Sequence, residues 1–549
     1  MIGEAPWGRL RKGWVLSGSV GDSRLQNKTR SCVFHAAAPH AVVFFICFAA
    51  APDARANVTL KSPFTDHMVL QRAVAVPIWG KADAGESVTV GFRGKTKAAV
   101  AAADGTWKVS LDASDAGGPF ELTAQGKNTV TLKDVMVGEV WLAGGQSNMA
   151  FNMQTIGGPN LDSAKAADHP DLRLMNYQGG GAWAACTPAV ALSFSATAYY
   201  FGRDLQQTLK VPVGIILSAV GGSEIEEWMD PATRAADPIL KTDTSAGHLY
   251  DKWIAPLAGY GMRGMVWYQG EFNARYTDST HPTWVLSTYR ARFEAHIKGW
   301  RKAWGQGDFP FYFVQLPNIN GLQTNAGGES PWAELREAQR LALSVPNTAM
   351  AVTIDVGMAD NLHPYDKWDV GLRLALAARA REYGETALAY QSPMYQSMQI
   401  QGKILRLVFR NAEGLAVKGG GKATGFAIAG ADNKWVWADV EIRKDTLLLS
   451  AASVAAPAKV RYAWAQNPPV NTFNGAGLPV SPFQTDGAQL PVTLVPTMDH
   501  GQRPAVLSRA AVPEADGVGN DGLGRRARSA GTDEANVRVI FVKDGKRNR

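Results

Sequence analysis

Residues 144–149 read Gly-Gly-Gln-Ser-Asn-Met and directly follow an apolar run at 135–143. Glycine permits backbone turns that other residues rarely adopt, and it lets a substrate approach the main chain. A serine that two glycines deliver at the end of a strand is therefore a candidate nucleophile at the edge of a sheet. We take Ser147 as that candidate. The alternative is an ordinary strand-to-loop turn with a solvated serine.

The sequence around this turn predicts an α/β domain over residues 135–386. Expected strands and helices alternate, which is typical of a doubly wound, mostly parallel sheet with helices on both faces. We expect strands at 137–143, 213–220, 263–268, 309–316 and 349–356, and helices at 198–210, 248–259, 283–304, 331–344 and 366–382.

The carboxyl ends of the strands are where such sheets bind ligands. Ser147, Gly-Gly-Ser at 221–223 and Gln-Gly-Glu-Phe-Asn at 269–273 directly follow the first three expected strands. A serine that attacks a carbonyl needs donors for the oxyanion, and main-chain N–H groups at a glycine turn and an asparagine amide supply them. We assign this role to Gly222, Asn273 and the N–H of Ser147. Taken alone, the glycines also fit a helix-entry turn, and Asn273 a local Asx turn.

The serine also needs a base, because an unassisted hydroxyl is a poor nucleophile at neutral pH. Two histidines stand in an Asp-x-x-His-Pro arrangement, His281 and His363. His363 follows the fifth expected strand and opens a helix, which places it at the same edge as Ser147. We predict His363 as general base and Asp360 as the carboxylate that fixes its tautomer. His281 is the alternative base, and a surface histidine that caps a helix is the alternative role for His363.

Short β-type runs separated by turn signals flank this domain on both sides. They predict an N-terminal β-sandwich at 57–134 and a C-terminal β-sandwich at 387–496. Trp435 and Trp437 could stack on sugar if exposed, although core packing is the commoner role of such residues. Residues 497–549 are rich in Gly, Ala and Arg without periodicity, and we expect a disordered tail there.

Residues 1–56 have the pattern of a leader. A basic stretch precedes an apolar run at 41–51, and residues 54–56 read Ala-Arg-Ala, an A-x-A cleavage pattern that is typical of a signal peptide. The run is shorter than the roughly twenty residues that span a bilayer. We therefore expect an exported mature chain, periplasmic or extracellular, with no membrane span after cleavage. An uncleaved anchor or a buried helix is the alternative.

The formal charge of +7 comes from the ends of the chain. Lysine and arginine exceed aspartate and glutamate by four in residues 1–56 and by three in 497–549, so 57–496 is neutral. We therefore expect no nucleic-acid partner. Cys186 is the one cysteine outside the leader, which excludes an intrachain disulfide and a cysteine-rich metal site in the mature chain. We expect neither a metal nor an organic cofactor.

Four ordered motifs resemble the SGNH hydrolase superfamily and, within it, the sialate O-acetylesterases. They are Gly-Gln-Ser-Asn-Met at 145–149, Gly-Gly-Ser-Glu-Ile-Glu-Glu-Trp at 221–228, Trp-Tyr-Gln-Gly-Glu-Phe-Asn at 267–273 and Asp-Asn-Leu-His-Pro at 360–364. The resemblance extends from about residue 62 to about residue 486. It implies an SGNH-type sheet, the triad Ser147, His363 and Asp360, and oxyanion donors at Gly222 and Asn273.

The resemblance also implies an activity, the transfer of acetyl from an O-acetylated sugar to Ser147 and then to water. The substrate it favours is an O-acetylated sialic acid. The sequence departs from the family at Ser223, where threonine is frequent, and at Phe272, where a small polar residue is common. Both departures bear on substrate selection. An acetyl xylan or other polysaccharide esterase is the alternative activity, and a non-catalytic carbohydrate-binding protein is the second alternative.

Four further residues are predicted to contact substrate: Gln146, Gln269, Glu271 and Arg336. An arginine can pair with a sialate carboxylate through two parallel hydrogen bonds. The alternative for Arg336 is a salt bridge within its helix or between domains.

Overall fold

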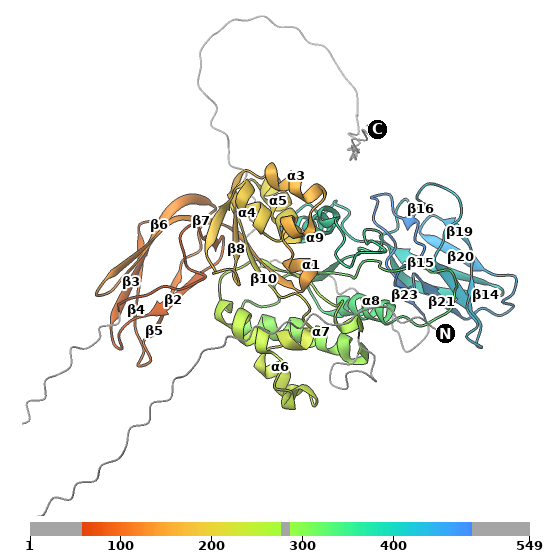
Figure 1. Cartoon of the computed structure of the whole chain (residues 1–549), viewed down its shortest axis with the longest axis horizontal. Coiled ribbons are helices and arrows are strands. Elements are labelled where there is room, and N and C mark those ends of the chain that lie inside the picture. Colours follow the sequence, from red (N-terminus) through yellow and green to blue (C-terminus); the bar gives the residue numbers. More distant parts are fainter. Residues whose placement is uncertain (1–56, 276–285, 486–549) are drawn as a thin grey trace, which may run out of the picture. The chain divides into compact units, whose positions relative to one another are not determined.

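The computed structural model describes residues 57–275 and 286–485 (Figure 1). A mostly parallel sheet lies at its centre, with strand order β13-β12-β11-β7-β10-β8-β9. The pair β8 and β9 is antiparallel, and the other neighbours along this order are parallel. The strands are β7 (Thr129–Gly145), β8 (His169–Asn176), β9 (Trp183–Cys186), β10 (Val213–Ala219), β11 (Gly264–Tyr268), β12 (Phe311–Val314) and β13 (Thr348–Ala351). The predicted mixed α/β fold with a mostly parallel sheet is confirmed.

Helices cover both faces of this sheet (Figure 1). Trp141 of β7 packs edge-on against Phe201 of α5 at 5.1 Å, and Trp267 of β11 packs against Trp300 of α7 at 5.7 Å. Trp141 pairs in register with Gly264, three residues before Trp267, so the two tryptophans point to opposite faces. Helix α5 packs with α9, and α7 packs with α8. The bounds are α5 (Ala196–Leu209), α7 (Leu286–Trp304), α8 (Pro331–Leu341) and α9 (Lys367–Glu382).

The order of the strands creates a switch point at β7. Strand β10 pairs with one side of β7 and β11 with the other, and Ala219 and Tyr268 both lie level with Gly145. A crevice for ligand forms where the strand order reverses in this way, outside the carboxyl ends of the strands. Ser147 follows β7 at this point.

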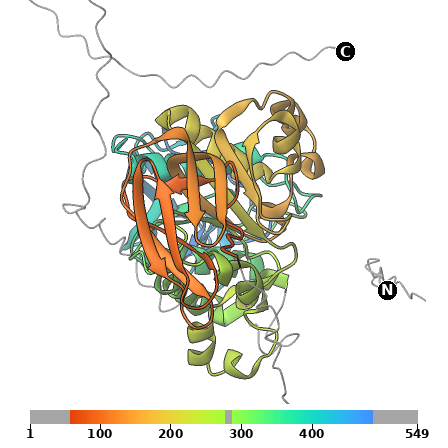
Figure 2. The same ribbon diagram turned by 90° about the vertical axis from the view of Figure 1, so that its left-hand side faces the viewer.

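Strand β7 also belongs to the N-terminal sheet, whose strands face the viewer in Figure 2. It passes residues 134 and 135 without a break, so the two sheets share one strand. The remaining N-terminal strands are β1 (Val69–Gln71), β2 (Val76–Lys81), β3 (Ser87–Phe92), β4 (Lys95–Val100), β5 (Thr106–Leu111) and β6 (Gly117–Gln125). Strands β2 and β5 form a separate antiparallel pair.

The C-terminal region contains two four-stranded antiparallel sheets and one strand pair. The first sheet is β14 (Met394–Gln401), β15 (Ile404–Arg410), β20 (Thr446–Ser450) and β19 (Asp439–Arg443). The second is β18 (Val436–Trp437), β17 (Phe426–Ala429), β21 (Lys459–Tyr462) and β23 (Phe483–Gln484), and the pair is β16 (Ala416–Val417) with β22 (Thr472–Phe473). The rings of Tyr395 and Phe483 stack at 4.6 Å, which joins the two sheets in one core. The predicted leader and tail lie outside the described residues.

The structure differs from the expected elements in several places, among them the start of β7 at Thr129 instead of residue 137 and the end of β13 at Ala351 instead of residue 356. Strands β8 and β9 were not expected, and they extend the sheet beyond β10. The helix expected at 248–259 is a π turn, η3 (Tyr250–Ile254), followed by a 3-10 turn, η4 (Ala255–Leu257). Pro256 lacks a backbone N–H, so a regular helix cannot continue through it. The other short elements are α2 (Met153–Ile156), α3 (Pro159–Lys165), α4 (Pro188–Ser193), α6 (Pro231–Ala236), η1 (Ile225–Trp228), η2 (Leu240–Thr242), η5 (Asn273–Arg275) and η6 (Ala342–Ser344).

Candidate active site

Ser147 begins the short helix α1 (Ser147–Ala150) directly after β7. Gly145 has φ +134°, and a Cβ atom there would lie 2.1 Å from the main-chain oxygen of Tyr268. This position therefore requires glycine. The N–H of Gln146 donates to the same oxygen at 2.9 Å, which fixes the turn against β11. Ser147 itself is buried, with an exposure of 6%.

His363 lies beside the serine, with its Nε2 atom 2.9 Å from Ser147 Oγ. The half-buried imidazole packs against the Phe151 ring at a centroid distance of 4.4 Å, and the backbone N–H of His363 donates to Asn361 Oδ1 at 2.9 Å. Burial, and after it the charge of Lys367, lowers the pKa of His363 below its usual 6.5. The neutral imidazole is therefore favoured near pH 7, the form that can accept the serine proton.

Asp360 does not contact this histidine in the structure. Its side chain is exposed, and among residues 57–275 and 286–485 no hydrogen bond or ion pair joins it to His363. Catalytic hydrogen bonds often form fully only when substrate is bound, so its role in orienting the base stays a prediction. The alternative base His281 and its neighbour Asp278 lie outside the described residues.

The glycine turn after β10 lies against the serine. A Cβ atom on Gly221 would stand 3.5 Å from the Ser147 Cβ atom. Gly222 has φ +72° and is exposed, and a Cβ atom there would lie 3.9 Å from the Phe272 ring. Glycine favours this left-handed backbone, which keeps the turn close to the serine without a side chain in the way. The structure thus brings the predicted turn to the predicted nucleophile.

Ser223 and Phe272, the two residues that depart from the family motifs, differ in burial and in what they contact. Ser223 is 2% exposed, and its hydroxyl donates to the main-chain oxygen of Val220 and accepts from Trp228 Nε1, both at 2.8 Å. Phe272 is half-buried beside Gly222. Ser223 therefore holds the turn from inside, whereas Phe272 lies at its exposed side.

Asn273 reaches the same turn from the loop after β11. Its Oδ1 accepts hydrogen bonds from the Ile225 N–H at 3.1 Å and from Gln269 Nε2 at 2.6 Å. Its Nδ2 donates to Glu226 Oε2 at 2.9 Å, and Glu226 in turn pairs with Arg292 at 2.9 Å. These bonds fix the orientation of the carboxamide. Because an amide nitrogen carries two hydrogens, the bond to Glu226 uses one of them.

Three of the residues predicted to contact substrate are buried parts of the loop framework. Gln146 Oε1 accepts the N–H groups of Gly270 and Phe272 at 3.1 and 3.3 Å. Gln269 Nε2 donates to the Ser223 main-chain oxygen at 3.1 Å as well as to the asparagine described above. Glu271 is 1% exposed. The side chains are thus placed next to the crevice, and contact with substrate stays a prediction.

Arg336 is fully buried, with 0% exposure. Its guanidinium donates to the main-chain oxygens of Leu316 (2.8 Å), Pro317 (2.7 Å), Ala465 (2.6 Å) and Gln466 (3.0 Å). It therefore ties the segment after β12 to the C-terminal region. This geometry favours a structural role for Arg336 over contact with substrate. The guanidinium fulfils that role by binding main-chain carbonyls and not by the salt bridge that was considered from the sequence.

Two buried residues next to the site were missed as functional candidates, Asn148 and Lys367. Asn148 lies within the motif around the nucleophile, so its position could have drawn attention. Lys367 is the first residue of α9 and is 0% exposed. No sequence pattern distinguishes it from an ordinary exposed lysine near a helix start.

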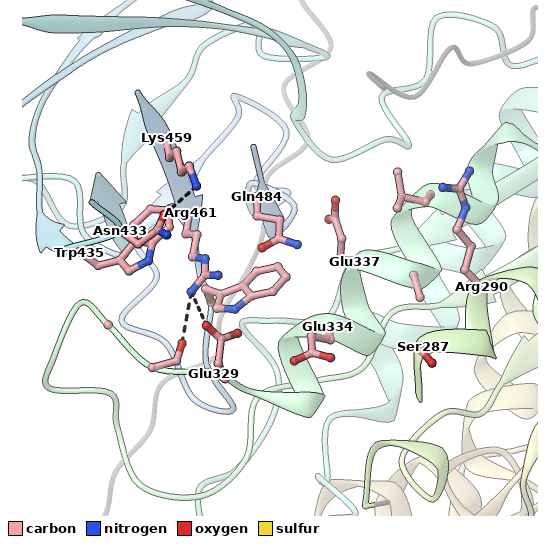
Figure 3. A pocket seen from close by; sticks show the side chains of 15 residues that line it. Ser287, Arg290, Glu329, Glu334, Glu337, Asn433, Trp435, Lys459, Arg461 and Gln484 are labelled. Carbon is pink, nitrogen blue, oxygen red and sulfur yellow. Dashed lines mark hydrogen bonds and ion pairs between the residues drawn. The ribbon is translucent and has the colours of Figure 1, made fainter. Parts of the chain in front are cut away.

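A separate cavity of about 850 Å³ lies between α8, the start of α7 and the C-terminal strand β21 (Figure 3). Trp435 lines this cavity, whereas none of the residues predicted for the triad, the oxyanion site or the four substrate contacts does. The Arg461 guanidinium lies 4.4 Å from the centre of the Trp435 ring and pairs with Glu329 at 3.2 Å. A cation therefore occupies one face of Trp435. Trp437 ends β18 and is 37% exposed.

The described part of the chain has neither a candidate metal site nor a candidate membrane-spanning helix. Within it, no three His, Cys, Asp or Glu side chains are grouped so that they could hold a metal ion. Nor does any helix in the described ranges have the length and apolar character that crossing a bilayer requires.

Comparison with known proteins identifies the family. Residues 137–380 match the family described as carbohydrate esterase, sialic acid-specific acetylesterase. Human sialate O-acetylesterase is 30% identical over 393 residues, which cover 62% of this chain and 74% of the human protein. The rat sialate O-acetylesterase is 29% identical over 485 residues, covering 73% and 88%. The crystal structure of a carbohydrate acetylesterase from Xanthomonas citri is 40% identical, with a TM-score of 0.72, and covers 78% of this chain and 99% of that one.

The fold and these likenesses define an esterase. More narrowly, the chain belongs to the sialate O-acetylesterase family of carbohydrate esterases. The resemblance of the four motifs to the sialate O-acetylesterases is confirmed.

Proposed function

We propose that this protein removes O-acetyl groups from sugars, with O-acetylated sialic acid as substrate, through Ser147, His363 and Asp360. The observation that carries the proposal is the 2.9 Å contact between His363 Nε2 and Ser147 Oγ at the switch point of the sheet. A nucleophile within hydrogen-bond reach of its base is the arrangement that acyl transfer requires. The family and the activity in the relatives' names support the same chemistry.

The proposed reaction has two halves. In the first, His363 takes the Ser147 proton while Oγ attacks the acetyl carbonyl, and the imidazolium then protonates the departing sugar oxygen. In the second, His363 takes a proton from water as the water oxygen attacks the acetyl-enzyme, and the imidazolium then returns this proton to Ser147 Oγ as acetic acid leaves and ionises to acetate. The N–H groups of Ser147 and Gly222 and the Asn273 amide stabilise the oxyanion in both halves. In this scheme, residues of the protein supply the nucleophile, the base and the oxyanion donors.

Asp360 completes the triad in this proposal by accepting a hydrogen bond from His363 Nδ1 when substrate is bound. The family motif supports this role. In the structure, however, the exposed Asp360 carboxylate makes no hydrogen bond to His363. The variant Asp360→Asn separates the two arrangements. A working triad predicts a loss of about 10⁴ in kcat. A loss of less than about ten-fold would leave Ser147 and His363 as a dyad.

A second candidate substrate is an acetylated neutral polysaccharide such as xylan. The burial of Arg336 favours it, because the arginine predicted to pair with a sialate carboxylate has no exposed surface. The Xanthomonas citri relative carries the broader description, carbohydrate acetylesterase. Both candidates use the same Ser147 chemistry and differ in the sugar that the crevice accepts.

We further propose that the catalytic region has the SGNH-type arrangement and that the protein is exported. The mostly parallel sheet and the order of the four motifs support the first proposal. The apolar run at 41–51 and the Ala-Arg-Ala pattern at 54–56 support the second. N-terminal sequencing of the protein from its own cells tests export, and we expect a mature terminus near Asn57.

A fluorophosphonate probe tests the nucleophile without choosing a sugar. We expect mass spectrometry to locate the adduct on Ser147, and we expect labelling to fall strongly in His363→Ala because the base is gone. Ser193→Ala is a matched control, since this serine ends the short helix α4 and its hydroxyl donates to the main-chain oxygens of Ala189 and Val190. Absence of labelling in the folded wild type would favour a non-catalytic carbohydrate-binding protein.

A further inference from the structure

Three buried polar side chains form a network directly behind the nucleophile, and the proposed chemistry uses none of them. They are Asn148 after the nucleophile, Glu271 in the loop after β11, and Lys367 at the start of α9, with exposures of 0%, 1% and 0%. Asn148 Nδ2 donates to Glu271 Oε1 at 2.6 Å, and Lys367 Nζ donates to Asn148 Oδ1. One carboxamide thus links a buried ammonium to a buried carboxyl group.

The same carboxamide connects the three segments that carry the proposed catalytic groups. Asn148 follows Ser147 in the chain, and Glu271 lies two residues before Asn273. Asn148 Nδ2 also donates at 3.1 Å to the main-chain oxygen of Leu362, the residue before His363. Small displacements of a catalytic group have large effects on rate, so this link bears directly on the 2.9 Å contact between base and nucleophile.

Burial of these charges is costly unless each group finds a partner. Burial raises the pKa of Glu271, and it lowers the pKa of Lys367 to about 7 although the charge of Glu271 opposes this effect. Apart from Glu271, the titratable groups that face Lys367 are Asp366 at the helix start, the Tyr268 ring 5.6 Å away, and His363. Lys367 therefore remains largely protonated below pH 7, the range in which His363 takes up a proton.

We propose that Lys367 is a positioning residue, which holds the three catalytic segments in register through Asn148 and opposes protonation of His363 by its charge. This inference rests on the proposed function of Ser147 and His363. The ammonium polarises the Asn148 amide from one side while Glu271 accepts from the other. Because Lys367 is buried, its positive charge is screened by solvent less than a surface charge would be, and it acts on the imidazole.

The charge effect is tested with Lys367→Met in the full-length protein. Methionine fills the space of the lysine stem without the charge, and Glu271 is expected to take up a proton so that no lone charge remains buried. We expect the pKa of His363 to rise, which moves the acid limb of the kcat/KM profile to higher pH. Lys302→Met is the matched control, because this lysine lies exposed on α7, and we expect no shift.

A second readout separates this inference from the proposed function, because it needs no turnover. Diethylpyrocarbonate modifies neutral imidazole, so its rate of reaction at His363 against pH, followed by peptide mass spectrometry, reports the pKa of this histidine. We expect the midpoint in Lys367→Met to lie above that of the wild type. An unchanged midpoint would overturn the inference even if the esterase activity is found. A shifted midpoint without activity on any acetyl ester would overturn only the proposed function.

The register effect is tested with Asn148→Ala. We expect kcat to fall about 10²-fold with little change in KM, because the reacting groups lose alignment while the crevice remains. If Lys367→Met does not fold, the double variant Lys367→Met, Glu271→Gln removes both charges together and is expected to shift the His363 midpoint in the same direction. Wild-type kcat in Asn148→Ala would show that the network does not position the catalytic groups.

Discussion

Replacing Asn273 by alanine removes the side-chain amide that we propose as an oxyanion donor. Loss of one such donor typically lowers kcat by about 10²–10³, equivalent to about 2.7–4 kcal/mol in activation free energy. The structure allows the accompanying loss of stability to be worked out separately. Asn273 has hydrogen bonds to Ile225, Gln269 and Glu226 that the variant would lose.

Two of these three partners keep another hydrogen bond. Glu226 keeps its ion pair with Arg292, and the Gln269 amide keeps the main-chain oxygen of Ser223. The Ile225 N–H loses the acceptor described for it, and a buried unsatisfied donor costs about 1–3 kcal/mol. We therefore expect Asn273→Ala to reduce the free energy of unfolding by about that amount while the protein remains folded at 25 °C.

The assay measures kcat and KM by acetate release, with thermal unfolding followed on the same samples. Tyr289→Phe is the matched control, because the Tyr289 hydroxyl donates to Gln269 Oε1 at 3.0 Å in the same cluster without being a proposed donor. We expect this control to lose about 1 kcal/mol of stability and to keep turnover close to that of the wild type. Turnover near the wild-type value in Asn273→Ala would refute the oxyanion assignment.

Three further predictions concern other parts of the structure. Because burial and Lys367 lower the pKa of His363, kcat/KM measured against pH should stay level below pH 6.5 and fall only as pH drops through the lowered pKa; a midpoint above 6.5 would contradict this. Gly145→Ala should lower the melting temperature far more than Gly94→Ala. A Cβ at Gly145 would lie 2.1 Å from a carbonyl oxygen, whereas Gly94, at φ +74°, has open space around it. Equal losses of melting temperature in calorimetry would contradict the close contact at Gly145. Arg336→Met should reduce the free energy of unfolding by several kcal/mol, at about 1–3 kcal/mol for each carbonyl left unsatisfied, and should leave KM unchanged. A raised KM for sialate esters without loss of stability would instead indicate that Arg336 binds substrate.

The sequence predicted those parts of the fold that depend on local patterns. The apolar run before Gln269 is bounded by glycine, so β11 was expected close to where it lies, whereas for β7 the run before Ser147 predicted only the second half of a strand that begins at Thr129. Strand β8 was missed because its first half, His-Pro-Asp at 169–171, is polar and contains a proline. Its second half, residues 172–176, pairs with β10, and such pairing between distant segments leaves no local pattern.

The sequence predicted the parts of the site that follow from strand order, but not those that depend on contacts between distant residues. The topology rule placed Ser147, the glycine turn at Gly222 and His363 at one edge of the sheet, and the structure brings them together there. The network through Asn148 and Lys367 could not be predicted, because its hydrogen bond joins residues 219 positions apart in the chain. Burial of a lysine is decided by tertiary packing, and its sequence neighbours give no sign of it.

The central claim is that Ser147 carries an acetyl group from a sugar to water. Acetate release tests it most directly, with the full-length protein and Ser147→Ala measured in parallel on 9-O-acetylated sialic acid and on acetylated xylooligosaccharide. The account predicts release by the wild type that disappears in Ser147→Ala, with the preferred substrate deciding between the two sugars. Release that persists in folded Ser147→Ala, or no release from either substrate by the folded wild type, would contradict it.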